Sequence, residues 1–159
     1  MSYYMKRKKK KEKPLPLFDK AGVKVKKKPD YKKKLDDIFS QYIRLKYAMP
    51  NGLCKCISCN TIKPWNKGIQ NGHYMSRRYM PTRFDEDNCR PQCIACNIFN
   101  QGNAQMFRRG LIAQIGEQRV DLVEYRAKNT TKKYSDIELK ELIKYYTALV
   151  NKLKKEKEI

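Results

Sequence analysis

Cysteine and histidine side chains are the groups of this chain whose types and spacing could do chemistry. Two Cys-x-x-Cys pairs occur, Cys56 with Cys59 and Cys93 with Cys96. Thiolates at this spacing bind zinc from a tight turn, and four of them saturate a tetrahedral zinc ion, which leaves no open position for a substrate. The pattern predicts one structural Zn²⁺ site. It leaves the single histidine of the chain, His73, for another task.

Two further cysteines compete with this assignment. Cys54 could replace Cys56 in a Cys-x-Cys arrangement, and Cys89 lies four residues before Cys93. Because two matching pairs form the stronger set, we expect Cys54 and Cys89 to be buried thiols, with a ligand swap left open. No apolar segment of signal-peptide type follows the N-terminal lysines, so we expect a cytoplasmic protein in which metal binding prevails over disulfides.

His73 is followed by two asparagines in an order that indicates phosphodiester hydrolysis. The order His73, Asn88, Asn97, set between and just after the cysteine pairs, is the layout of HNH-type (ββα-metal) nucleases. Such hydrolysis needs a base that activates water, a cation that stabilises charge on the phosphate, and a group that fixes the base. Each residue alone has a structural interpretation, since a lone histidine often lies in a core and asparagine often caps helices.

Arginines close to His73 are candidates for DNA contacts. Arg77, Arg78 and Arg83 follow it, with tyrosines between them, and this mixture suits phosphate binding and base stacking. The alternative is that these arginines are ordinary surface residues.

Elements that could position these residues follow from apolar periodicity and turn signals. In chain order we first expect a helix from about residue 30 to before residue 50, and then a zinc knuckle and strand over 53–65. A hairpin or long loop over 66–92 should present His73, and a helix should begin at about Cys93 or Ile94. Helices over 103–116 and 117–127 follow, and a last helix begins after Ser135, which forms a capping box with Glu138. The broad apolar face of the last helix is either core, which we favour, or a homodimer seam.

Charge points to a polyanionic partner. The chain has 37 Lys and Arg against 16 Asp and Glu, a formal net charge of +21. Nucleic acid is the first expectation, and no apolar run is long enough for a membrane span. Residues 1–30 are expected to form a basic, disordered arm in which Lys8, Lys9 and Lys10 contact DNA phosphates.

Several separated segments agree in order and spacing with one known family. They are Tyr42 to Lys46, Cys56 to Asn60, Gly72 to Arg77, Arg83 to Asn88, Gln92 to Asn97, and Gly102 with Asn103. These segments resemble the NinG (Rap) family of lambdoid-phage recombination proteins, which cut branched DNA such as Holliday junctions and displacement loops. The resemblance covers roughly residues 38–125 and implies a structure-selective endonuclease in an infected bacterial cell, with phage recombination proteins as further partners.

A more distant similarity, to phage junction resolvases of the endonuclease VII group, concerns the asparagine that follows the last cysteine. It implies that Asn97 binds a catalytic Mg²⁺ ion, for which Mn²⁺ could substitute, that His73 is the general base, and that Asn88 orients His73 or its strand. Many HNH enzymes have a metal-binding Asp immediately before the histidine, whereas this chain has Gly72. The ion would then need another oxygen ligand, for which Asp87 is the candidate, with Asp85 and Asn100 as alternatives.

The complete prediction is an α+β protein. A zinc-stabilised ββα-metal core (HNH-like, treble-clef) occupies residues 31–127, with flanking helices, the basic arm before it and an amphipathic helix within 128–159 that packs on the core or pairs two copies. The predicted function is magnesium-dependent cleavage of branched DNA. Two alternatives stay open: a non-enzymatic zinc module that binds nucleic acid, and an HNH nuclease that acts on linear duplex.

Overall fold

The computed structural model describes residues 28–159, so the expected arm, including Lys8, Lys9 and Lys10, lies outside the described residues apart from its last three. The elements are α2 (Tyr31–Lys46), β1 (Leu53–Lys55), β2 (Ile62–Pro64), β3 (Ile69–His73), the 3-10 turns η1 (Met80–Thr82) and η2 (Glu86–Asn88), β4 (Cys89–Cys93), the π-helical turn η3 (Ala95–Phe99), α3 (Ala104–Ile115), α4 (Glu117–Asn129) and α5 (Asp136–Lys157). This is a mixed α+β fold, as predicted.

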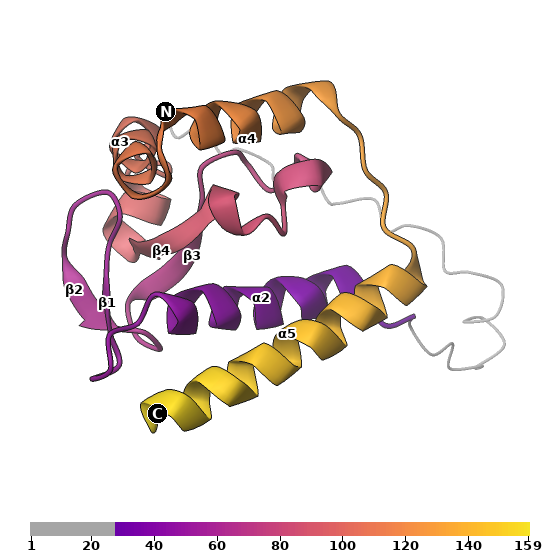
Figure 1. Cartoon of the computed structure of the whole chain (residues 1–159), viewed down its shortest axis with the longest axis horizontal. Coiled ribbons are helices and arrows are strands. Elements are labelled where there is room, and N and C mark those ends of the chain that lie inside the picture. The colour runs from indigo at the N-terminus through magenta and orange to yellow at the C-terminus, as the bar shows by residue number, and fades with distance from the viewer. Residues whose placement is uncertain (1–27) are drawn as a thin grey trace, which may run out of the picture.

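Two long helices, α2 and α5, lie side by side along one side of the molecule (Figure 1). The N-cap Asp30 accepts a hydrogen bond from the Lys33 backbone N–H at 2.9 Å, and Ser135 and Glu138 form the expected capping box at the start of α5. Capping supplies partners for backbone N–H groups that have none within the helix. Both helix starts were therefore readable from local sequence.

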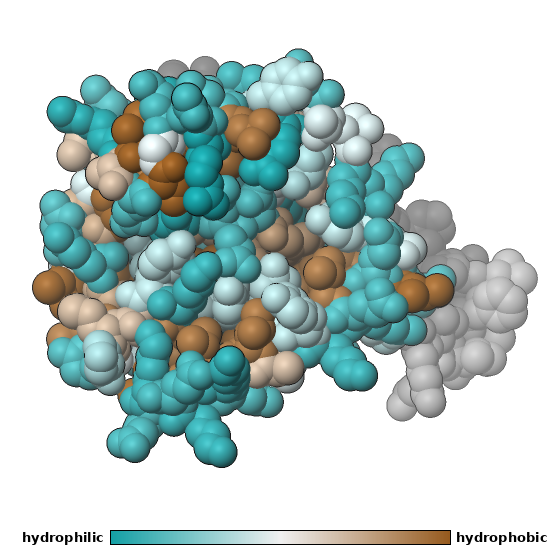
Figure 2. Space-filling model, viewed as in Figure 1, coloured by the Kyte–Doolittle hydropathy of each residue, from teal (hydrophilic) through white to brown (hydrophobic). Residues whose placement is uncertain are grey.

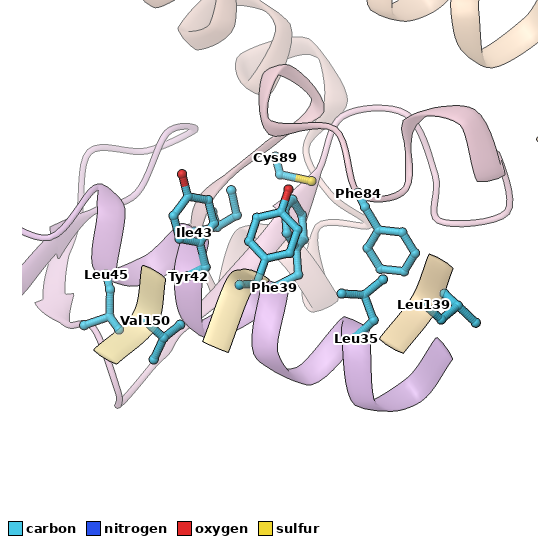
Figure 3. Close-up of a cluster of buried hydrophobic side chains, with 10 residues drawn as sticks. Leu35, Phe39, Tyr42, Ile43, Leu45, Phe84, Cys89, Leu139 and Val150 are labelled. Carbon is cyan, nitrogen blue, oxygen red and sulfur yellow. The ribbon is translucent and has the colours of Figure 1, made fainter. Parts of the chain in front are cut away.

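The main core lies where α2 meets α5 and the loop before β4 (Figure 3). Phe39 on α2 has its ring centroid 4.9 Å from that of Tyr146 on α5 and 5.8 Å from that of Phe84 in the loop before β4. The apolar face of α5 thus covers the interior of the protein itself, the arrangement favoured over a dimer seam. The buried members are Leu35, Phe39, Tyr42, Ile43, Leu45, Phe84, Cys89, Leu139, Tyr146 and Val150.

A two-stranded antiparallel hairpin, β3 with β4, lies between α2 on one side and α3 and α4 on the other (Figure 1). Its register pairs Ile69 with Cys93 and His73 with Cys89. Within residues 28–159, the second edge of β3 has no partner strand. The expected hairpin that presents His73 is present, and His73 is the last residue of its strand.

A second, shorter hairpin joins β1 to β2 through the first cysteine pair. The Cys56 N–H donates to the Thr61 carbonyl at 2.8 Å and the Asn60 N–H donates to the Cys56 carbonyl at 3.0 Å. Asn60 adopts φ of +62°, a left-handed conformation that asparagine tolerates better than most residues. This is the knuckle expected over residues 53–65.

The helix expected from Cys93 or Ile94 is much shorter than a regular helix. Only the π-helical turn η3 forms, in which the Asn100 N–H donates to the Ala95 carbonyl at 2.9 Å. Gln101, Gly102 and Asn103 then take positive φ values of 50°, 89° and 44°. Consecutive left-handed residues cannot continue a right-handed helix, so the chain turns and restarts as α3.

Among the residues described, no helix is both long enough and apolar enough to cross a membrane. Figure 2 shows hydrophilic side chains over most of one face, with hydrophobic side chains exposed in small groups.

Candidate functional site

Both predicted cysteine pairs come together in one cluster. The Sγ atoms of Cys56, Cys59, Cys93 and Cys96 all lie within 4.8 Å of one another, and those of Cys59 and Cys93 are 3.6 Å apart. Zinc–sulfur bonds of about 2.3 Å give a tetrahedron with edges of about 3.8 Å, so this spacing fits one zinc ion. The cluster can therefore bind a metal such as zinc, with ligands from the β1–β2 knuckle, the end of β4 and η3.

The thiols of the cluster have different surroundings. Burial raises the pKa values of Cys56 and Cys96. Burial also acts to raise the pKa of Cys59, but hydrogen bonds with Thr61, whose hydroxyl is 3.2 Å from the sulfur, and with Cys56 and Cys96 together lower it to about 6. Cys59 is exposed, whereas its three partners are buried. The side chain of Trp65 packs against the buried group that contains Cys56, Cys93 and Cys96.

Cys54 and Cys89 lie outside the four-sulfur cluster, so the ligand swap left open by the sequence does not occur. The Cys54 thiol donates to the Arg44 carbonyl, with sulfur and oxygen 3.1 Å apart, and burial raises its pKa to about 11. Burial also raises the pKa of Cys89, which is completely enclosed. Both residues are the buried thiols that we expected.

A cleft of about 750 Å³ follows the unpaired edge of β3, between α2 and the η3 turn. His73 and Asn97 both line it. His73 and Asn97, which the HNH-like order of residues had associated with each other, therefore border the same cleft. Other polar residues that line the cleft include Arg44, Gln70, Asn71 and Arg77.

His73 is held in one tautomer. Its Nε2 lies 3.0 Å from the Arg83 carbonyl oxygen, and because a carbonyl only accepts, Nε2 must carry the proton and donate. Burial lowers the pKa of His73 to about 4, so the ring is neutral at pH 7. Its Nδ1 lone pair has no hydrogen-bond partner among residues 28–159 and is available to accept a proton.

Asn88 fixes the loop that follows His73. It is fully buried, its Nδ2 donates to the carbonyls of Met75 and Thr82 at 2.9 Å each, and its Oδ1 accepts from the Met75 N–H at 2.6 Å. These bonds tie Met75 to Thr82, the two ends of the loop just before Arg83, whose carbonyl is bonded to His73. Strand β4 follows Asn88, so a helix-capping role is excluded.

Asn97 and Asn71 line the cleft, and each has a side-chain oxygen without a hydrogen-bond partner among the described residues. The Asn97 Nδ2 donates to Gln70 Oε1 at 2.6 Å, which orients the amide and leaves its Oδ1 available. Asn71 Oδ1 is buried and has no hydrogen-bond partner in the described part of the chain. Sequence reasoning missed Asn71, although it stands two residues before His73, and residues i and i+2 of a strand share a face.

Asp87 and Asp85 are not brought to His73. Both line a second cleft of about 620 Å³, which does not include His73 or Asn97. Asp87 forms an ion pair with Arg119 at 2.6 Å and Asp85 one with Arg126 at 2.7 Å. Asn100 is exposed and does not line the His73 cleft either.

The arginines near His73 differ in their surroundings. Arg83 donates from Nε to Asp36 at 2.9 Å and from Nη1 to the Arg77 carbonyl at 2.7 Å, so it ties the loop to α2. Arg77 and Arg78 are exposed, and Arg78 stacks on Tyr79. Arg44 was not singled out as a site residue, yet it lines the cleft and forms no ion pair with any residue in 28–159. Its guanidinium donates to the carbonyls of Ser40 and Trp65.

Carboxylates are absent from the segments that build the cysteine cluster and the edge of β3. Residues 38–84 contain eight Lys and Arg but no Asp or Glu, and residues 89–116 contain three Lys and Arg but no Asp or Glu. The acidic contributor to the cleft is Asp36, which is paired with Arg83. The surface around His73 is therefore suited to a polyanion.

Comparison with known proteins gives one family. The family model described as Bacteriophage Lambda NinG protein matches residues 3–157, a wider range than the 38–125 over which the resemblance was recognised. Similar relatives are the ninG proteins of Escherichia phage 933W (40% identical) and Escherichia phage lambda (39% identical), each over 72 residues. These alignments cover 43% of this chain and 34% and 33% of the relatives, so the matched part spans about a third of their length.

Salmonella phage P22 has a ninG protein that is 40% identical over 72 residues, with the same coverage of this chain. No solved structure matches the chain. The match of the family model over almost the whole sequence identifies this chain as a member of the NinG family of bacteriophage proteins.

Proposed function

We propose that this chain is a metal-dependent DNA endonuclease in which His73 is the general base. One observation carries the proposal: a neutral histidine, fixed through Nε2 and with no hydrogen bond at Nδ1 among the described residues, lines the cleft that Asn97 also lines. A structural histidine would ordinarily have both nitrogens enclosed or paired. The β1–β2 knuckle, the β3–β4 hairpin and the η3 turn follow one another in the order that we would expect of an HNH-like, treble-clef core, which supports the proposal.

In this proposal His73 takes the proton of the attacking water at Nδ1. The Arg83 carbonyl keeps the other nitrogen protonated and fixes the plane of the ring. Asn88 acts as a positioning residue, because its three hydrogen bonds fix the loop that carries that carbonyl. General-base catalysis of this kind accelerates a reaction by about 10²- to 10⁴-fold.

Asn97 Oδ1 is the proposed protein ligand of a divalent ion, with Asn71 Oδ1 beside His73 as the second oxygen. A bound Mg²⁺ would supply positive charge for the phosphate and the leaving oxygen. Both proposed ligands are neutral amides, so we expect weak binding and a largely hydrated ion. The cysteine cluster has the separate role of a structural zinc site, holding η3 and thereby Asn97 in place.

DNA is the proposed substrate because the cleft lies in segments without carboxylates apart from Asp36. The exposed Arg77, which lines the cleft, and the exposed Arg78 next to it are proposed to bind the phosphate backbone near the cut. Preference for branched DNA, such as Holliday junctions and displacement loops, comes from the family resemblance. With it comes the proposal that the chain acts in recombination in the infected cell, alone, as a homodimer or with other phage recombination proteins.

A competition assay tests the proposal. A four-way junction and a linear duplex of the same sequence, carrying different labels, are incubated together with the zinc-loaded protein in Mg²⁺ or Mn²⁺. We expect preferential cleavage of the junction, and for His73→Ala at least a roughly 100-fold loss of cleavage with binding retained. Asp87→Asn is the matched control: it lies in the second cleft, so its cleavage should stay close to wild type.

Two outcomes would replace the proposal. A wild-type protein that binds both DNAs but cuts neither in Mg²⁺ or Mn²⁺ would be a non-enzymatic zinc module. Equal or preferred cleavage of the linear duplex would indicate an HNH nuclease of another purpose.

A further inference from the structure

The η3 turn carries the most exposed large hydrophobic side chain of the described residues. Phe99 is 78% exposed and its neighbour Ile98 is 53% exposed. We call these two residues the apolar tip. Single exposed apolar residues are common, but an exposed phenylalanine next to an exposed isoleucine at the rim of a cleft calls for a binding partner.

Several contacts fix the backbone that presents the apolar tip. Cys96 belongs to the cysteine cluster, and Asn97 is bonded to Gln70 on β3. The Asn100 N–H donates to the Ala95 carbonyl at 2.9 Å and the Gly102 N–H to the Cys96 carbonyl at 3.0 Å. The exposure of Phe99 is therefore imposed by a braced turn, and π-helical turns of this kind are frequent at functional sites.

The tip stands at the edge of the proposed nuclease cleft. Ile98 lines the same cleft as His73 and Asn97, and Phe99 is the next residue outward. A strand that occupied this cleft would therefore lie next to Ile98. The tip is continuous with the site where a backbone would be cut.

The tip lies in a segment without carboxylates. Residues 89–116 contain no Asp or Glu. The cleft that Ile98 lines is also lined by the cationic side chains of Arg44 and Arg77. The fitting partner is one that combines negative charge with flat apolar faces.

We propose that Phe99, supported by Ile98, stacks on an unpaired or unstacked base where DNA branches. This inference rests on the proposed nuclease function and adds the feature that the enzyme recognises. Phosphates satisfy the cationic surroundings, and the face of a base satisfies the phenyl ring. Continuous duplex hides its base faces by stacking, so contact with the tip costs unstacking there and much less at a branch. Stacking would thus give branch preference without reading sequence.

The test measures binding by the full-length, zinc-loaded protein without Mg²⁺, so no cleavage is needed. The probes are a four-way junction with 2-aminopurine at the branch point and a linear duplex of the same sequence. We expect Phe99→Ala to weaken junction binding roughly tenfold, leave duplex binding unchanged and abolish the protein-induced fluorescence change. Phe99→Trp should restore both signals.

Tyr125→Ala is the matched control, because Tyr125 is a 60% exposed aromatic residue on α4 that does not line the cleft. The proposal is overturned if Phe99→Ala keeps the wild-type ratio of junction to duplex affinity, if Tyr125→Ala lowers it equally, or if Phe99→Ala changes only the oligomeric state. The two proposals fail separately. If the wild type cuts no DNA, but Phe99→Ala weakens junction binding, the stacking role stands and the nuclease proposal fails. If the wild type cuts DNA, but Phe99→Ala keeps the preference for branched DNA, the nuclease proposal stands and the stacking role fails.

Discussion

His73 has different surroundings at its two ring nitrogens. Nε2–H donates to the Arg83 carbonyl, while Nδ1 is left without a partner among the described residues. The same burial that orients the ring also lowers its pKa to about 4. A base with so low a pKa is a weak proton acceptor, but it is always in the active, neutral form at physiological pH.

The pH dependence of cleavage should follow from this pKa. The neutral ring is the active form, so the rate should persist as pH falls from 7 to 5 and be lost as pH falls through about 4, rather than through the 6.5 of an unperturbed histidine. Single-turnover rates from pH 8 down to below pH 4 measure this. Zinc content must be followed in the same samples, because thiolates release zinc on protonation. A half-maximal rate near pH 6.5 with zinc retained would contradict the buried, neutral state.

Gly72 explains why no metal-binding carboxylate precedes His73. A Cβ at Gly72 would lie 2.5 Å from Gln92 Oε1 and 2.8 Å from Phe107 Cε2, so a side chain here would run into β4 and α3. Asn71 Oδ1, by contrast, is unpartnered in the described chain, and Asn71 lines the cleft. The aspartate side chain that many HNH enzymes have immediately before the histidine therefore does not fit at residue 72.

Gly72→Ala should therefore destabilise the protein by about 1–3 kcal/mol or more, the usual cost of overpacking a close contact. Urea unfolding measures the free energy change. Gly102→Ala is the comparison: its Cβ would meet nothing within 4 Å, although its φ of +89° adds backbone strain. If Gly72→Ala proves as stable as wild type, the close approach of Gln92 and Phe107 is not a constraint.

At the scale of elements, the cysteine cluster joins three pieces that have few other bonds to one another. It links the β1–β2 knuckle, the end of β4 and the η3 turn that carries Asn97. Strands β1 and β2 have three residues each, too few to hold this region alone. Metal binding energy is thus expected to be folding energy for this part of the chain.

Cys59→Ser should lose zinc and unfold the region around the cluster, whereas Cys54→Ser should keep one zinc per chain. Cys54 lies outside the cluster and bonds only to the Arg44 carbonyl, so its loss costs a buried contact but no ligand. Zinc per chain by elemental analysis and the far-ultraviolet circular dichroism spectrum are the measurements. A zinc-free Cys59→Ser protein that is fully folded would contradict the structural role.

Elements with local signals were predictable from the sequence, and those set by distant contacts were not. The periodicity of α2 and α5, the capping box at Ser135 and the spacing of the cysteine pairs each depend on neighbouring residues. The shortness of η3 depends on three left-handed residues after it. Asp87 and Asn88 are adjacent, yet one faces Arg119 and the other is buried against Met75, because the long loop before β4 folds back on itself. The sequence alone therefore could not show that Asp87 lines the second cleft and pairs with Arg119.

For the whole molecule, the distribution of charge matters more than its sum. Apart from Asp30, Asp36 and Asp37 at α2, the acidic residues of the described chain concentrate in 85–87 and in the helices α4 and α5, the end of α5 included. The apolar tip belongs to a segment without them, and the acidic residue that lines the cleft, Asp36, is paired with Arg83. A net charge of +21 alone would bind nucleic acid without orientation. The division into acidic and carboxylate-free regions gives DNA a preferred face.

Salt dependence of DNA binding tests this orientation. Each phosphate neutralised on binding adds about 0.9 to the slope of log affinity against log salt, so the wild type should show a steep slope. Arg77→Ala and Arg78→Ala should each reduce that slope by about one, because both side chains are exposed beside the cleft. Lys144→Ala, on the exposed side of α5, is the control and should leave the slope unchanged, because α5 lies across α2 from the hairpin that carries His73 (Figure 1). Equal effects of all three substitutions would mean that DNA binds through charge alone, without a preferred face.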